Sequence, residues 1–146
     1  MSQPSPIQLL NRLLALVSRS FPQYLQFSRP HVPEGCDNLE ETVAAIVTDQ
    51  NGIAERIGQM ILDAQALPRS GEFPMEYTDM HDLEIDFLIN MAIGYQQQDV
   101  DAIVHLVDQL QLAPAAKSLA EEALGMAKGH LESLRELVNQ EVTSDE

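Results

Sequence analysis

The chain has 146 residues, enough for one domain with a buried core, and 45% of them are hydrophobic, which is a globular composition. Eight basic residues stand against 23 acidic ones. The resulting net charge of -15 argues against nucleic acid and anionic membranes, which are bound mainly through Lys and Arg. No apolar run approaches the roughly 20 residues of a membrane span, and the single Cys36 excludes an internal disulfide, so we expect a cytoplasmic protein.

The first part of the chain predicts two helical pieces with a kink between them. Residues 6–19 form an amphipathic helix in which four apolar residues share one face: Leu10, Leu13, Leu14 and Val17. Pro22 would break the interior of a longer helix, and Ser20 can instead cap a new turn that carries Tyr24. The prolines and the glycine of 30–35 then predict a loop.

A long second helix is predicted from a cap at Asp37 or Asn38 to about Ala66. At about 100° per residue its apolar side chains fall within a narrow arc. These residues are Leu39, Val43, Ile46, Ile53, Ile57, Ile61 and Ala64. Gln50 lies inside the same arc, so it is the polar residue of this helix that we expect to point inward.

The segment 67–78 is the longest irregular stretch of the sequence. Twelve extended residues reach up to about 40 Å at roughly 3.3 Å each. That is the length of a helix of about 27 residues. We therefore expect this segment to cross the bundle from end to end, so that the helices before and after it run parallel.

Three helical segments are predicted in the rest of the chain. Thr78 caps a third helix over 79–97, and 99–110 reads as a short amphipathic helix. The fourth long helix starts at Pro114, which suits a first helical turn, and reaches about Glu141.

No internal repeat and no alternating strand pattern is found, so the predicted fold is all-α. We expect a four-helix bundle with a crossover loop and one short extra helix. It forms a single domain over 1–146, with flexible ends at 1–5 and 142–146.

Inward-pointing polar residues mark the candidate site. The third helix is expected to bury one arc: Met80, Leu83, Phe87, Met91, Gly94 and Tyr95. Glu84 falls inside that arc, whereas the acids around it fall off the arc and are expected in solvent beside the positive helix end. In the fourth helix His130 lies in the middle of the core face. The other histidines are expected in loops or on the surface: His31, His81 and His105.

If the third and fourth helices are antiparallel, Glu84 and His130 lie at similar depths and are expected to form a buried pair, since a buried carboxylate needs a partner. Tyr24 and Gln50 are possible neighbours. One interpretation is a hydrogen-bonded pair that fixes the helix register. The other is a minimal metal site for iron or zinc, because His nitrogen and Glu oxygen ligate both.

Two segments of the chain resemble sequences of the ferritin-like superfamily, and within it those of the starvation-induced mini-ferritins. The first helix carries NRLLAL at 11–16, a Pro-Gly loop follows, and the second helix carries IAERI at 53–57. The long crossing loop and the short extra helix are also similar. The resemblance is strongest over 9–66, and the remaining half matches by helix order. It implies a ferritin-like four-helix bundle.

The metal chemistry of that family is only partly matched. Its di-iron sites use two Glu-x-x-His pairs and two further glutamates. No Glu-x-x-His occurs here, and His81-x-x-Glu84 has the reverse order. The mini-ferritin ferroxidase site needs an Asp four residues before Glu55, where this chain has Asn51. Tyr24 stands about where the family has a first-helix His.

Two functions follow as hypotheses. The absence of both Glu-x-x-His motifs favours a non-enzymatic module that assembles with itself or binds a protein partner, with a degenerate metal site. The alternative is a divergent ferritin-like protein that binds iron or another metal, with ferroxidase activity as the only enzymatic possibility.

Overall fold

The computed structural model describes residues 4–28, 37–79 and 85–144, and within these ranges it contains helices and no strand. The elements are α1 (Pro6–Ser18), α2 (Phe21–Phe27), α3 (Asp37–Asp63), the short 3-10 helix η2 (Met75–Asp79), α4 (Ile85–Gln109) and α5 (Pro114–Ser144). The predicted all-α class is confirmed. No helix in the described ranges combines the length and the apolar character needed to cross a membrane.

Serine caps define both short N-terminal helices. The Ser5 side chain accepts a hydrogen bond from the Gln8 amide, while the Gln8 side chain accepts one from the Ser5 amide, which makes a capping box. Ser20 caps α2 in the same manner by accepting from the Gln23 amide, and Pro22 lies in the first turn. The break predicted at Pro22 is thus confirmed, since α1 ends at Ser18 and α2 begins at Phe21.

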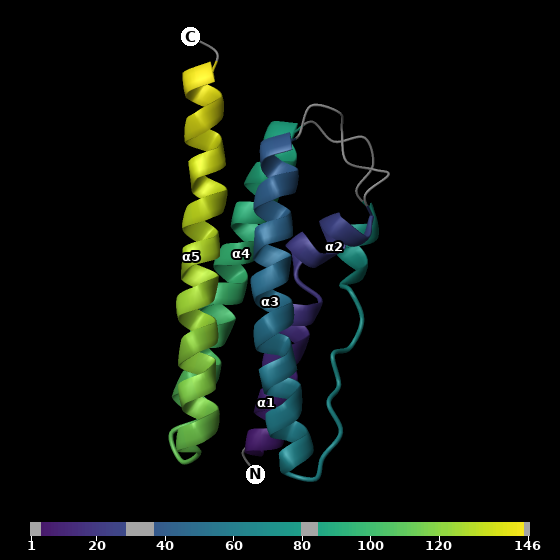
Figure 1. The fold of residues 1–146 in the computed structure, drawn as a ribbon, viewed down its shortest axis with the longest axis vertical. Helices are drawn as coiled ribbons and strands as arrows, with labels where there is room; N and C mark the ends of the chain where they lie inside the picture. Colours follow the sequence, from purple (N-terminus) through teal and green to yellow (C-terminus); the bar gives the residue numbers. More distant parts are fainter. Residues whose placement is uncertain (1–3, 29–36, 80–84, 145–146) are drawn as a thin grey trace.

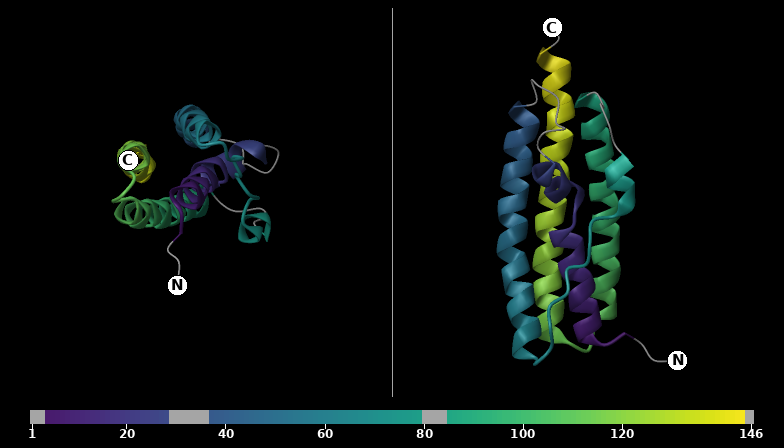
Figure 2. Two further views of the ribbon diagram at one scale, coloured as in Figure 1. Left: turned by 90° about the horizontal axis from the view of Figure 1, so that it is seen from below. Right: turned by 90° about the vertical axis from the view of Figure 1, so that its right-hand side faces the viewer.

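The bundle has a parallel pair of helices joined by a crossover. α3 and α4 begin at the same end of the bundle, while α1 and α5 run in the opposite direction (Figure 1). The segment after α3 returns along the outside of α1 towards η2, as its reach predicted (Figures 1 and 2). α3 packs against α1, α2 and α5, and α4 packs mainly against α5. Seen down the bundle axis, α3 and α4 lie diagonally opposite one another (Figure 2, left).

α3 ends slightly earlier than predicted, at Asp63 instead of Ala66. The amides of Gln65 and Ala66 donate to the carbonyls of Leu62 and Ile61, which is the hydrogen-bond pattern of a Schellman motif. Gln65 has a φ of 62°, a left-handed conformation that glycine usually supplies at this position. The chain therefore leaves the helix here and starts the crossover.

The predicted break between the third helix and a short extra helix is wrong. α4 runs from Ile85 to Gln109 without interruption and contains both predicted pieces. The boundary was expected between residues 97 and 99, but glutamine is a good helix former and residues 96–99 contain no helix breaker. Gln97 donates to Asp101 at 3.1 Å, an i,i+4 pair of the kind that stabilises a helix at this point.

The predicted buried arc of the third helix is only partly correct in its described part: Met91 and Tyr95 are partly buried and pack against the core, whereas Phe87 and Gly94 are exposed. Phe87 is 54% exposed, while Leu88, Ile89 and Ala92 are buried. The core-facing stripe of α4 is set over the whole helix and continues at helical spacing to Leu110. Because the helix was expected to stop near residue 97, the position of its apolar stripe was derived from too few residues.

The core consists of two separate apolar clusters. One combines α1 with the second half of α3, the second half of α4 and the first half of α5. The other combines α2, the first half of α3, η2, the start of α4 and the later part of α5. Ile93 packs against both clusters. The boundary between them lies near the middle of the bundle, and it is there that polar residues are buried.

Candidate functional site

Four buried polar side chains form a layer between the two apolar clusters, and each comes from a different part of the bundle. They are Ser20 at the α1–α2 junction, Gln50 on α3, Gln96 on α4 and His130 on α5. Their exposed fractions are between 2% and 6%. We call these four residues the central polar layer. Bundle proteins build ligand and metal sites from side chains that face one another in this manner.

Hydrogen bonds connect the central polar layer to its surroundings. Ser20 Oγ donates to Gln50 Oε1 at 2.9 Å, which joins α2 to α3. Gln96 Nε2 donates to the carbonyl of Ala127 at 3.0 Å, which joins α4 to α5. His130 Nε2 lies 2.9 Å from an Asp49 carboxylate oxygen, which joins α5 to α3. Each contact offsets part of the cost of burying a polar group.

The His130–Asp49 contact fixes the tautomer of the imidazole. A carboxylate can only accept a hydrogen bond, so Nε2 carries the proton and neutral His130 presents a bare Nδ1. Asp49 itself is 58% exposed and lies in a groove of about 330 Å³ between α3 and α5. The pair is therefore buried at its imidazole end and open to solvent at its carboxylate end.

Two acceptors in this layer have no partner in the described part of the chain. His130 Nδ1 and Gln96 Oε1 are both buried and form no hydrogen bond there. The orientation of the Gln96 amide is set by its nitrogen, which must face the Ala127 carbonyl. An unsatisfied buried acceptor costs about 1–3 kcal/mol, so these two atoms offset part of the stability that the hydrogen bonds of the layer provide.

The structure agrees with the predicted positions of some site residues and not of others. His130 and Gln50 are buried, as predicted. Glu84 and its expected contact with His130 lie outside the described residues. The partner that the structure gives His130 is Asp49. Tyr24 is half-buried among aromatic rings, with centroid distances of 5.4 Å to Phe73 and 5.6 Å to Tyr77.

The three members of the site that sequence reasoning missed were hidden for different reasons. Ser20 was recognised only as a helix cap, and its hydroxyl serves both roles. Gln96 lies inside the predicted third helix but was not among its expected buried residues. Asp49 follows the helical pattern of an exposed residue, and only the packing of α5 against α3 brings it to His130.

The donor set for a metal is small in the part of the chain that the structure describes. No three His, Cys, Asp or Glu side chains there lie close enough together to hold a metal ion. Asp49 and His130 provide two such groups, but the carboxylate is bonded to the ring nitrogen that carries the proton.

A second candidate site is a cleft of about 490 Å³ between α1, the crossover and α4, which we call the crossover cleft. Its walls are mainly apolar and include Ala15, Leu16, Pro74, Ala102 and Leu106. Its polar groups include Arg12 of α1, Arg19 just after α1, Tyr77 of η2 and Asp99 of α4; the others are Ser70, Glu72, His105 and Gln109. Figure 2 (right) shows the crossover passing over α1 towards α4, the three segments that supply the lining residues.

Asp99 is the unusual group of the crossover cleft. It is half-buried, and burial raises the pKa of its carboxyl to about 7. No described residue forms a hydrogen bond or an ion pair with it. The pKa of the Tyr77 hydroxyl is also raised, first by burial and then by the charge of Asp99. A carboxyl with a perturbed pKa in a cleft is a feature of functional sites.

The wall opposite α4 is fixed to α1 by several contacts. Arg19 Nε donates to the Gly71 carbonyl at 2.9 Å, and its guanidinium lies 5.1 Å from the centroid of the Phe73 ring. Asn11 Oδ1 accepts from the Arg69 amide. Tyr77 is buried against Phe21, with the ring centroids 5.1 Å apart. The cleft is therefore formed before any ligand binds.

Comparison with known proteins gives no family assignment: no protein-family model matches the chain, and no curated protein is significantly similar to it. Function is therefore inferred from the residues of the two sites.

Proposed function

We propose that this protein is a non-enzymatic binding module on a ferritin-like helical bundle, in which the central polar layer is a degenerate metal site. The parallel pair α3 and α4 with its crossover supports the ferritin-like part of the proposal (Figure 1). The observation that carries the functional part is the composition of the layer. It contains a hydroxyl, two amides and one imidazole, and no carboxylate.

Such a layer is poorly suited to redox chemistry on a metal. Sites that perform catalysis on a metal usually supply three or more protein ligands, and di-iron sites supply several carboxylates. Here the amide of Gln50 is bonded to Ser20, and that of Gln96 is bonded to the backbone of α5. These contacts fix the relative positions of the helices, and we assign the layer that structural role.

A surface for self-assembly or a protein partner is available at one end of the bundle. Leu62 and Leu67 flank the end of α3 and are 50% and 71% exposed, and Leu112 in the α4–α5 turn is 97% exposed. The end of α3 and the α4–α5 turn lie at the same end of the bundle (Figure 1). Exposed apolar side chains at the same end of a bundle support association there.

One specific observation favours the alternative, a divergent protein that binds iron or zinc. A histidine that ligates a metal typically donates its other ring N–H to a carboxylate, and Asp49 holds the Nε2–H of His130 in that arrangement. The bare Nδ1, which has no hydrogen-bond partner among the described residues, would then be the ligand atom. Glu84 remains a candidate ligand in this alternative.

Two measurements on the purified protein test the proposal. With ferrous iron under air, we expect no oxidation above a buffer blank and at most sub-stoichiometric bound iron or zinc. Rapid oxidation that disappears in Glu84→Ala and in His130→Leu would establish the enzyme instead. For assembly, we expect light scattering to show an oligomer that Leu112→Ser weakens. Phe87→Ser, near the other end of the bundle and 54% exposed in the wild type, is the control.

A further inference from the structure

We infer that the crossover cleft binds a small amphipathic anion, a molecule with an apolar body and a single carboxylate head. This site is separate from the central polar layer and from the apolar end of the bundle, so it does not depend on the function proposed above.

The size and the walls of the cleft suit the apolar body. A volume of about 490 Å³ lies within the range of small-molecule sites, which are typically apolar with a few convergent polar groups. Leu16 and Leu106 face the cleft from two helices, and Pro74 closes it from the crossover. Because Arg19 and Asn11 hold the crossover in place, little ordering is needed on binding.

The charges of the cleft suit the head group. Two of the eight basic residues in this acidic chain line it, Arg12 and Arg19. Arg56, Lys117 and Arg135 each pair with a glutamate elsewhere. Arg12 has no hydrogen bond or ion pair with any described residue and is exposed at the mouth, so its five N–H donors are available to a carboxylate.

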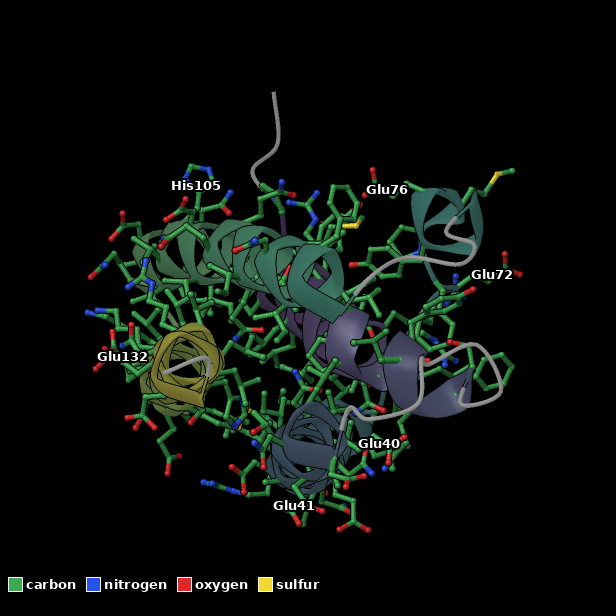
Figure 3. The ribbon with its side chains drawn as sticks, turned by 90° about the horizontal axis from the view of Figure 1, so that it is seen from above. Glu40, Glu41, Glu72, Glu76, His105 and Glu132 are labelled. Atoms are coloured by element: carbon green, nitrogen blue, oxygen red, sulfur yellow. The ribbon has the colours of Figure 1, made fainter. Side chains whose placement is uncertain are left out.

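The acidic groups of the cleft do not oppose an anion. Glu72 is at the rim, and its side chain points away from the bundle (Figure 3). Asp99 lies deeper, and burial keeps it largely protonated below pH 7, where it is a neutral hydrogen-bond donor. His105, which also lines the cleft, lies on the outer side of α4 (Figure 3). At pH 6, with Asp99 mainly neutral, the lining therefore carries the two positive charges of Arg12 and Arg19 against the carboxylate of Glu72.

Calorimetric titration of the full chain at pH 6 with three probes of the same alkyl length tests the inference. The probes are octanoate, octylammonium and octanol. We expect octanoate to bind at least about tenfold more tightly than octanol, because a charge-assisted hydrogen bond is worth more than about 1.4 kcal/mol. Octylammonium should bind most weakly. Octylammonium binding more tightly than octanoate, or octanol binding equally well, would overturn the inference.

Variants locate the binding site. Arg12→Gln should weaken octanoate binding about tenfold, while Arg69→Gln, which makes the same charge change next to the cleft but outside its lining, should change it less than about twofold. Equal losses in both variants would mean general attraction and no defined site. Ala102→Phe should fill the cleft and abolish binding while circular dichroism shows an intact helical fold. Octanoate binding that survives Ala102→Phe, or no binding to the folded wild type, would also refute the site.

Discussion

The central polar layer and the crossover cleft both place polar groups beside apolar ones, but the two sites differ in how far those groups are buried and in whether they have hydrogen-bond partners. In the layer, Ser20, Gln50 and Gln96 are neutral and buried and direct their hydrogen bonds at other parts of the chain. In the cleft, Arg12 and Asp99 can be charged, face solvent in part and have no partner among the described residues. The hydrogen bonds of the layer stabilise one arrangement of helices, even though Gln96 Oε1 and His130 Nδ1 form none with a described residue. The ionisable groups of the cleft instead face solvent in part and remain available to a ligand.

The largest effect that this comparison predicts is in the layer. Gln50→Ala removes a 3% exposed side chain and leaves the Ser20 hydroxyl without its acceptor. The free energy of unfolding should fall by about 3 kcal/mol, from the cavity and the unsatisfied hydroxyl together. Urea titration followed by circular dichroism measures it. The control is Gln59→Ala on the exposed face of the same helix, which should cost less than about 0.5 kcal/mol. An equal loss of free energy of unfolding in both variants would show that Gln50 stabilises the fold no more than an exposed glutamine does.

In the cleft, by contrast, a substitution at Asp99 is predicted to raise the free energy of unfolding. The pKa of Asp99 rises from 3.8 to about 7 on folding, so the folded state binds more protons between these values. Stability is therefore lost as pH rises through about 7, and the loss persists above it. Asp99→Asn cannot ionise and should raise the free energy of unfolding at pH 8 by on the order of 2 kcal/mol, a value reduced for partial solvent screening.

The pH dependence gives the Asp99 prediction its control. The gain in free energy of unfolding of Asp99→Asn over the wild type should become smaller as the pH is lowered from 8 to 5. The reason is that the wild-type carboxyl is then protonated in the folded state. Asp101→Asn, two residues away on the exposed side of α4, makes the same charge change and should show no such trend. If the two variants behave alike across this range, Asp99 is solvated and the cleft is not as apolar as its lining indicates.

The sequence predicted the parts of this molecule that depend on local pattern. Pro22 predicted the α1–α2 break because it cannot continue a helix, and the length of 67–78 predicted a crossover because a shorter loop cannot span a bundle. Gln50 and His130 were found because each stands inside an apolar arc. The continuous α4 was missed because the segment was divided at 97–99, although no proline or glycine interrupts it there.

The sites were harder to predict than the fold because they depend on contacts between distant segments. Asp49 and His130 are 81 positions apart, and neither the spacing nor the composition of their surroundings couples them. The crossover cleft needs α1, the crossover and α4 at once, and its key residue, Asp99, looked like the start of a short helix. Asp49 and Asp99 have no distinctive sequence pattern, and they become candidate site residues only through the tertiary packing around them.

The smallest predicted effect distinguishes the two interpretations of the layer. Asp49→Asn keeps an oxygen that can accept from His130 Nε2, at a position where the side chain is 58% exposed. If the pair is only a structural hydrogen bond, the free energy of unfolding should change by less than about 1 kcal/mol, as measured by urea titration. Bound metal should also be unaffected. If the carboxylate instead orients a metal-binding imidazole, the same variant should lower zinc affinity about 10- to 100-fold while leaving the stability of the metal-free protein almost unchanged. Metal titration of wild type and variant side by side separates these outcomes, and a zinc affinity that falls in Asp49→Asn would favour the metal-binding alternative over the structural role.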